Sequence, residues 1–340
     1  MKKWIALLLI AALAFCCACT QTQPEQDAVD ATSEPVADAT DAPETTDEPE
    51  ADADGEAAYR VGIIQLTEHA ALDAAREGFV DALNESGLNI KIETQNAQGE
   101  QTVCATKFVN DQVDLILAIA TPAAQAAAQA TKDIPILVTA VTDPASSGLV
   151  ASNDAPGCNV SGTSDMNPVE DQANLLAKLV PEAKTVGIMY HSSEDNSILQ
   201  AEMAQQALEA LGLTVEIFTC ADATEVQAVA QSAAGKVDAL YLPTDNLMAD
   251  TIATISMVCT PAGVPIICGE SNMVNGGGTA TYGIDYYKLG EQTAAQAIRI
   301  LSEGADISTM PIEYYDAELE LVVNEDVMAQ LGLTVPDDLQ

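Results

Sequence analysis

The sequence predicts an α/β protein of two similar lobes, each a doubly wound parallel sheet with helices on both faces. Short apolar runs alternate with segments of helical length, which is typical of parallel strands joined by helices. The same plan occurs twice, with an offset close to 125 residues, as between Val61 and Val186. The 340 residues, of which 48% are apolar, are enough for two domains with substantial cores.

The first copy begins with an apolar strand in YRVGII, from Tyr59, and continues through a polar turn into an amphipathic helix. In AALDAAREGFVDALNES, residues 70–86, apolar side chains recur every three or four residues. Gly87 suits the end of this helix, and an alternating strand follows. The apolar stripe consists of Leu72, Ala75, Phe79, Val80 and Leu83.

Residues 114–141, DLILAIATPAAQAAAQATKDIPILVTAV, predict a buried strand, a helix and a second buried strand. The first strand stops at Thr121-Pro122. This pair is typical of helix starts, because threonine caps free N–H groups and proline needs no amide partner in the first turn. We therefore expect Thr121 to be a helix N-cap.

The second copy repeats these segments in the same order. KTVGIMYHSSEDNSILQAEMAQQALEALGLTVEIFTC, from Lys184, again predicts a strand, a helix that ends at Gly-Leu, and an alternating strand. VDALYLPTDNLMADTIATISMVCTPAGVPIICGES, from Val237, corresponds to the run from Val113. Each copy is therefore expected to form one lobe.

The chain continues beyond the second copy, with a helix expected in residues 283–304, then the segment IEYYDAELELVVN at 312–324 and a short helix in 325–333. These pieces require three crossings between the lobes, and several parallel linkers make a hinge that opens and closes without swivelling freely. We expect crossings near residues 162–168, 281–285 and 310–312, with residues 59–164 and 283–310 in lobe 1 and residues 165–282 and 311–340 in lobe 2.

The first residues, MKKWIALLLIAALAFCCAC, have the layout of a secretory signal, with two lysines and then twelve apolar residues, too few to span a bilayer. Their end resembles a bacterial lipobox, so we expect a signal peptide at residues 1–18 and lipidation of Cys19, with an ordinary cleaved signal as the alternative. Residues 20–58 hold thirteen acidic and no basic residues, which is typical of an extended, disordered tether. The expected arrangement is an exported protein, with Cys19 and its tether (19–58) anchored to the outer face of the bacterial cytoplasmic membrane.

Charge and residue spacing exclude several function classes. A net charge of −40, with 12 basic residues, repels nucleic acid phosphates and anionic lipid headgroups, so we expect a small, near-neutral or zwitterionic ligand. His69 and His191 have no second ligand at metal-binding spacing, and NGGGTATYG at 275–283 lacks the order of a nucleotide-binding loop, so we expect no metal or cofactor. The five cysteines after residue 58 lack CxxC spacing and are expected to be small buried residues, although one disulfide remains open.

Polar residues follow the strands of both copies. In open α/β sheets, ligands bind beyond the carboxyl ends of the strands, where helix N-termini present free N–H groups. Carboxylates there suit a ligand ammonium, hydroxyls and amides suit a carboxylate, and tyrosines suit an apolar side chain. Helix capping and core packing are the alternative roles. The candidates are Gln65, Thr67, Glu68, Thr121, Thr142, Asp143, Tyr190, Ser192, Thr244, Asp245, Asn246, Glu270 and Asp285, with Tyr241, Tyr282 and Tyr286 at comparable positions.

Seven ordered segments resemble a known family: GIIQLTEHAALDAAREGFVDAL, DLILAIATPAAQAA, PILVTAVTDP, GCNVSGTSDM, TVGIMYHSSEDNS, DALYLPTDN and ATYGIDYYKLGEQTA. They are similar to the substrate-binding lipoproteins of bacterial ABC transporters, which have the type I periplasmic-binding-protein fold, and resemble most the tryptophan and tyrosine uptake receptors. The similarity covers residues 59–340. It departs from the family pattern at Ala70, where proline is common, and at Cys158, where glycine is common.

The resemblance implies a Venus-flytrap receptor, expected to be a monomer, that captures a small solute between its lobes and delivers it to the permease subunits of an importer. The implied solute is an aromatic amino acid, tryptophan, tyrosine or phenylalanine, and the resemblance adds Asn196 to its contacts. We expect no catalysis, because no ordered arrangement such as GxSxG or HExxH occurs. Two alternatives remain: an exported enzyme acting on a small amino-acid-like substrate, and a ligand-sensing receptor for a membrane signalling protein.

Overall fold

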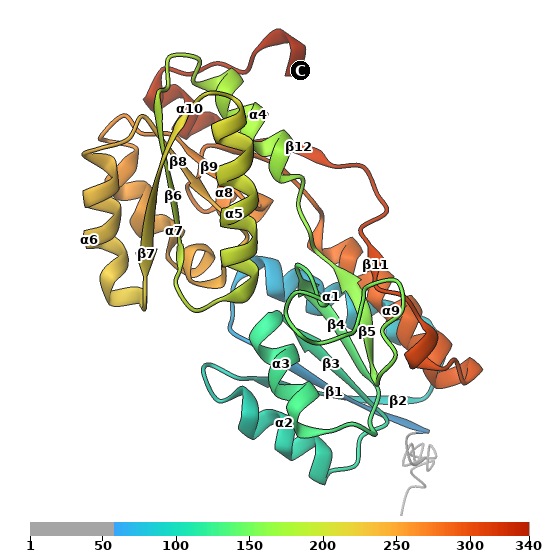
Figure 1. Ribbon diagram of the computed structural model, residues 1–340. Helices are drawn as coiled ribbons and strands as arrows, with labels where there is room; N and C mark the ends of the chain where they lie inside the picture. Colours follow the sequence, from blue (N-terminus) through green and yellow to red (C-terminus); the bar gives the residue numbers. More distant parts are fainter. Residues whose placement is uncertain (1–57, 340) are drawn as a thin grey trace, which may run out of the picture. The chain divides into compact units, whose positions relative to one another are not determined.

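The computed structural model describes residues 58–339, which form two six-stranded sheets flanked by helices (Figure 1). The strand order is β11-β5-β4-β3-β1-β2 in the first sheet and β12-β10-β9-β8-β6-β7 in the second. The five-strand part β5-β4-β3-β1-β2 therefore recurs as β10-β9-β8-β6-β7. This shared order confirms the predicted α/β class and the duplication.

Lobe 1 consists of a parallel sheet between two pairs of helices. α1 and α9 pack with the strands in one buried apolar cluster, and α2 and α3 pack in a second cluster. The elements are β1 (Tyr59–Gln65), α1 (Ala70–Glu85), β2 (Ile90–Asn96), α2 (Gln101–Asn110), β3 (Leu115–Ile119), α3 (Thr121–Ala130), β4 (Ile136–Val141), β5 (Val160–Ser164), α9 (Tyr286–Glu303), η1 (Ile307–Thr309) and β11 (Glu313–Tyr314).

Lobe 2 repeats the plan, with β12 as an antiparallel edge strand. α6, α7 and α8 pack in one apolar cluster, and α4, α5 and α10 pack in another. The elements are α4 (Val169–Leu179), β6 (Thr185–His191), α5 (Asp195–Ala210), β7 (Thr214–Cys220), α6 (Ala223–Ala234), β8 (Ala239–Leu242), α7 (Asn246–Cys259), β9 (Ile266–Cys268), α8 (Ser271–Asn275), β10 (Ala280–Gly283), β12 (Glu320–Val323), α10 (Glu325–Leu331) and η2 (Asp337–Leu339).

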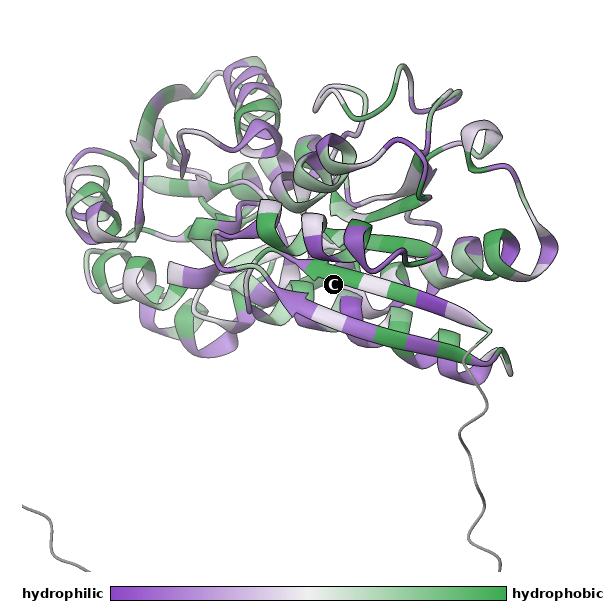
Figure 2. Cartoon of the chain, turned by 90° about the horizontal axis from the view of Figure 1, so that it is seen from below, coloured by the Kyte–Doolittle hydropathy of each residue, from purple (hydrophilic) through white to green (hydrophobic). Residues whose placement is uncertain are grey.

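Helix α1 shows how the sequence pattern becomes packing. Its predicted stripe is buried at Leu72, Ala75, Phe79 and Leu83, while Val80 is half-buried beside the same cluster. Most helices carry hydrophilic and hydrophobic residues together (Figure 2), as expected when one face covers a sheet and the other meets water.

The start of α3 differs from the prediction by one residue. The helix begins at Thr121, and its N-cap is Ala120, whose φ is +82°. Pro122 lies in the first turn, as expected. Thr121 is buried, and its hydroxyl has no hydrogen-bond partner among residues 58–339, so it does not cap the helix.

The chain passes between the lobes three times: between β5 and α4, between β10 and α9, and between β11 and β12. The third passage lies later than the expected boundary at residues 310 and 311. Glu313 and Tyr314 pair with Thr163 and Ser164, so this segment belongs to lobe 1. The pairing extends the first sheet by one short parallel strand, which the sequence pattern did not indicate.

The predicted signal peptide, the lipidation of Cys19 and the acidic tether lie outside the described residues, apart from residue 58. None of the helices within residues 58–339 is long and apolar enough to cross a bilayer. The five cysteines of this part are free thiols, of which four are buried and Cys158 is half-buried.

Candidate functional site

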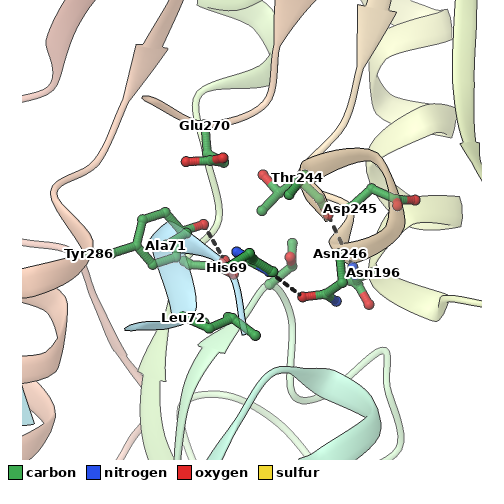
Figure 3. A pocket seen from close by; sticks show the side chains of 13 residues that line it. His69, Ala71, Leu72, Asn196, Thr244, Asp245, Asn246, Glu270 and Tyr286 are labelled. Atoms are coloured by element: carbon green, nitrogen blue, oxygen red, sulfur yellow. Dashed lines mark hydrogen bonds between the residues drawn. The ribbon is translucent and has the colours of Figure 1, made fainter. Parts of the chain in front are cut away.

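A narrow pocket with a cavity volume of about 20 Å³ lies between the two lobes (Figure 3). It lies where strands of both sheets end and helices begin, which is the expected ligand position in open α/β sheets. The residues that line it are His69, Ala71, Leu72, Ala140, Thr142, Asp165, Asn196, Thr244, Asp245, Asn246, Ala249, Glu270 and Tyr286.

Asp165 is the most unusual member of this pocket. It follows β5, and the residue is only 1% exposed. Its Oδ2 accepts a hydrogen bond of 2.7 Å from the Tyr286 hydroxyl, at the start of α9. Its Oδ1 has no hydrogen-bond partner within the described part of the chain. A buried carboxylate oxygen without a donor is costly, so this atom is suited to a donor supplied by a ligand.

Burial raises the pKa of the Asp165 carboxyl. The Tyr286 hydroxyl opposes this shift, because it hydrogen-bonds the charged form. The Thr142 hydroxyl lies near enough to oppose it as well, without making a hydrogen bond to Oδ1.

Asp245 and Glu270 combine a structural role with their place in the pocket. Asp245 caps α7 by accepting from Met248 N at 2.8 Å, and its second oxygen accepts from His191 N at 2.7 Å. Glu270 caps α8 through bonds of 2.6 and 2.7 Å from backbone amides. Burial nevertheless raises the pKa of each carboxyl to about 7.

Glu194 organises the side chains of lobe 2 around the pocket. Its carboxylate accepts from Asn246 Nδ2 at 2.8 Å and from Asn196 Nδ2 at 3.3 Å. His191 Nδ1 lies 3.3 Å from the other oxygen, and this contact raises the pKa of His191 to about 9. His191 is therefore a cation at neutral pH, and it lowers the pKa of the Glu194 carboxyl against the opposing effect of burial.

Three hydrogen bonds join the lobes across the pocket and its rim. His69 Nε2 lies 3.2 Å from Asn246 Oδ1. Because Asn246 presents its amide nitrogen to Glu194, Oδ1 must accept, and His69 must carry its hydrogen on Nε2. Burial lowers the pKa of His69, so the ring is neutral near pH 7. Gln200 Nε2 donates to Thr142 Oγ1, and Gln125 Nε2 donates to Asp195 Oδ2.

Six of the fourteen residues predicted from the sequence to contact the ligand line the pocket: Thr142, Asn196, Thr244, Asp245, Asn246 and Glu270. The other eight do not line the pocket: Gln65, Thr67, Glu68, Thr121, Asp143, Tyr190, Ser192 and Asp285.

Local geometry explains several of these outcomes. Gln65 holds the turn after β1 through bonds to Thr67 O and Asp73. Asp143 accepts from Ser146 N and Asn153 Nδ2, within its own loop. Tyr190 packs against the lobe 2 core, and Ser192 is exposed. Asp285 caps α9. Strand-end position alone does not distinguish these roles, because the residues of one turn point in different directions.

His69, Asp165 and the supporting Glu194 were not among the predicted ligand contacts, and Tyr286 was named only as a strand-end residue at a comparable position. Asp165 lies in the expected crossing at residues 162–168 and directly follows β5, so its position at a strand end was a usable signal. Tyr286 stood next to the chosen Asp285. Tyr241, considered for the apolar wall, is instead a core residue whose hydroxyl donates to Gln172 Oε1 at 2.8 Å.

The chemistry of the pocket is that of an acceptor-rich, anionic site. None of its lining residues from the described part of the chain is a lysine or an arginine, while three are carboxylates. Within residues 58–339, no group of three or more His, Cys, Asp or Glu side chains is arranged to hold a metal ion. A pocket of this kind suits a small ligand that brings a positive charge and further hydrogen-bond donors.

Residues 60–340 match the family described as ABC transporter substrate binding protein. The chain is 42% identical to the tyrosine-binding protein of Clostridioides difficile strain R20291 over 280 residues, which cover 80% of this chain and 81% of the relative. Among solved structures it resembles the ABC domain in complex with L-Trp from Streptococcus pneumoniae, with a TM-score of 0.79 and 35% identity, covering 83% of this chain and 97% of the other.

A second solved structure is the ligand-free, open form of a substrate-binding protein with adhesive properties from Clostridium difficile. Its sequence identity to this chain, 44%, is higher than that of the L-Trp complex, but its TM-score, 0.65, is lower. The match covers 82% of this chain and 97% of the other. The greater likeness to the L-Trp complex agrees with the hydrogen bonds that join the two lobes here. The family match, the two solved structures and the two-sheet architecture together establish that this chain belongs to the ABC transporter substrate-binding proteins and has the type I periplasmic-binding-protein fold.

Proposed function

We propose that the protein captures an aromatic amino acid, tryptophan, tyrosine or phenylalanine, between its lobes and delivers it to the permease of an ABC importer. The observation that carries this proposal is the unpartnered Oδ1 of Asp165 in a pocket without basic side chains. An α-ammonium group placed there forms a charge-assisted hydrogen bond and relieves the cost of the buried carboxylate. The names of the tyrosine-binding and L-Trp-bound relatives support the aromatic class.

The start of α1 suits the carboxylate of the same ligand. Ala71 and Leu72 lie in the first turn of this 16-residue helix and line the pocket, and the side chain of the N-cap residue His69 makes no capping hydrogen bond. Its free N–H groups and the positive end of the helix dipole therefore make this helix start suited to bind an anion. Leu72, Ala140 and Ala249 supply apolar surface for the side chain of the ligand.

We propose binding without turnover. His191 pairs with Glu194 and is protonated at neutral pH, so it is unsuited to act as a base. His69 uses Nε2 for the bond to Asn246. The family and its relatives, which are substrate-binding proteins, support this reading over the exported enzyme.

The proposed setting is extracytoplasmic, as for other substrate-binding proteins of ABC transporters. The sequence from Met1 to residue 58 supports a lipid anchor at Cys19 and an acidic tether that holds the binding lobes away from the membrane. We propose that the protein acts as a monomer. A receptor that signals to a membrane protein shares this arrangement, and measuring uptake of labelled ligand in cells with and without the permease separates the two roles.

The test of the binding function is calorimetric titration of the protein lacking its signal peptide with each of the twenty amino acids. We expect saturable one-to-one binding of an aromatic amino acid, a ligand-dependent rise in melting temperature, and unchanged ligand after incubation. A ligand at 100 times its Kd stabilises the folded state by about 2.7 kcal/mol. The absence of binding by all twenty would refute the amino-acid assignment.

The affinity is expected to rise with pH between about 5.5 and 7.5. The pKa values of Asp245 and Glu270 are raised to about 7 in the free protein, so both carboxyls bind protons below that pH. A ligand ammonium favours the ionised carboxylates, and binding therefore releases protons. If one carboxylate must ionise, the affinity at pH 5.5 should be about 30-fold lower than at pH 8.

The stability of the free protein should change in the opposite direction. A carboxyl with a raised folded-state pKa contributes stability below its unfolded pKa, near 4, and this contribution is lost as the pH rises through about 7. The ligand-induced rise in melting temperature should therefore be larger at pH 8 than at pH 5.5. Differential scanning fluorimetry at both pH values measures this, and a pH-independent shift would show that Asp245 and Glu270 do not lose protons when the ligand binds.

A further inference from the structure

Asn196 is a second pocket residue with a buried acceptor that no group in the described part of the chain satisfies. The residue lies in the first turn of α5 and is 5% exposed. Its Oδ1 has no hydrogen-bond partner among residues 58–339. Leaving such an amide oxygen unpaired costs free energy, unless a ligand supplies the donor.

The orientation of the Asn196 amide follows from its neighbours. Its Nδ2 lies 3.1 Å from the carbonyl oxygen of Thr244 and 3.3 Å from Glu194 Oε2. The carbonyl oxygen of Thr244 can only accept a hydrogen bond, and so can the carboxylate of Glu194 when it is ionised. The contact with His191 favours this ionised form, because it lowers the pKa of the Glu194 carboxyl. The nitrogen must therefore face Thr244 and Glu194, which leaves the amide oxygen as the free atom.

The two unpartnered oxygens belong to different sides of the pocket. Asp165 follows β5 of lobe 1, whereas Asn196 is on α5 of lobe 2. In Figure 3, Tyr286, which donates to Asp165, and Asn196 lie on opposite sides of His69. Both residues line the same pocket, so a ligand with its ammonium at Asp165 can direct its side chain toward Asn196.

We infer that Asn196 Oδ1 accepts the polar hydrogen of the ligand's ring, the phenol O–H of tyrosine or the indole N–H of tryptophan, and so selects these two over phenylalanine. The inference rests on the proposed function and deepens it. A site that provides a buried partner for a substrate donor rejects the analogue without that donor, because its own acceptor is then left unpaired. Selection arises at the ring end, while Asp165 recognises a group common to all amino acids.

The first test uses ligands and leaves the protein unchanged. Calorimetric titration compares tyrosine with phenylalanine, and tryptophan with 3-benzothienylalanine, in which sulfur replaces the ring N–H. We expect each analogue without a donor to bind at least about tenfold more weakly than its partner, from the cost of one unsatisfied buried acceptor. Equal affinities within both pairs would overturn the inference and leave the aromatic-receptor proposal standing.

The second test uses Asn196→Leu, with Thr121→Val as the matched control. Thr121 also has a buried, unpartnered oxygen, but it lies outside the pocket. In Asn196→Leu we expect the affinities for tyrosine and tryptophan to fall by about tenfold or more, while the affinity for phenylalanine stays the same. The preference for tyrosine and tryptophan over phenylalanine should therefore fall below about threefold. Thr121→Val should keep the preference.

Equal loss for all three ligands in Asn196→Leu would place this oxygen at the ammonium and overturn the inference. Failure of wild-type protein to bind any of the three would instead refute the proposed function itself. If Asn196→Leu does not fold, the ligand pairs still decide the question.

Discussion

Replacing Asp165 with asparagine is expected to weaken binding of the amino acid by on the order of 100-fold or more, because removing one partner of a buried charged pair costs several kcal/mol. The free protein should be as stable as wild type or more stable. The change removes a buried carboxylate with a raised pKa, while the Tyr286 hydroxyl keeps an oxygen to donate to. Titration calorimetry measures the affinity, and thermal unfolding without ligand measures the stability.

The matched control is Asp143→Asn, which follows the neighbouring strand β4 and was predicted from the sequence as a ligand contact. Asp143 is half-buried, does not line the pocket, and accepts from Ser146 N at 2.9 Å. Its replacement should leave the Kd within about threefold of wild type, since no ligand charge is paired there. A lower melting temperature for Asp165→Asn with unchanged affinity would show that Asp165 is a structural residue, and the ammonium site would have to lie elsewhere.

Replacing Gly290 with alanine is expected to lower the free energy of unfolding by about 3 kcal/mol, in the upper range for overpacked sites. Helices α1 and α9 approach closely at two glycines. A Cβ at Gly290 would collide with the carbonyl oxygen of Ala75, and one at Gly78 would collide with that of Tyr287. Backbone cannot move aside as a flexible side chain does, so this loss exceeds the gain of about 1 kcal/mol in helix propensity.

Denaturant unfolding measures this effect, with Gly235→Ala as the control. Gly235 ends α6 with φ of −83°, and the nearest atoms to an added Cβ would be 3.7 Å away. That substitution should change stability by no more than about 0.5 kcal/mol. Similar stability for Gly290→Ala and wild type would mean that the two helices separate freely.

The same helix pair also positions the pocket. α1 carries Leu72 and follows His69, and α9 begins at Tyr286, the donor to Asp165. Their close approach at Gly78 and Gly290 brings these side chains to one place, although they are more than 200 residues apart in the chain. We therefore expect Gly290→Ala to weaken binding in addition to lowering stability.

The two unpartnered oxygens explain how binding can depend on both lobes. Asp165 Oδ1 follows a strand of lobe 1, and Asn196 Oδ1 belongs to a helix of lobe 2. A ligand that satisfies both can do so only when the lobes are together, and it therefore favours the closed arrangement by its differential affinity. The hydrogen bonds from His69 to Asn246 and from Gln200 to Thr142 support the same arrangement.

Local sequence determined the repeated architecture. The offset between Val61 and Val186, the apolar stripe of α1 and the short buried runs were sufficient, because strand and helix periodicity depend only on near neighbours. The rule for strand ends likewise identified Thr142, Asp245 and Glu270, since parallel strands bring their carboxyl ends to one edge.

Only the tertiary structure decided which of the strand-end residues meet in the pocket and which of their atoms remain free. Asp165 is hydrogen-bonded to Tyr286, which is 121 residues away in the chain. Asn196 is oriented by the carbonyl group of Thr244, which is 48 residues away. Tyr190 occupies a strand end as well, yet it packs into the core of lobe 2. Residue type and spacing contain no information on such distant contacts, because the direction of a side chain in a turn depends on packing between segments that are far apart in the chain.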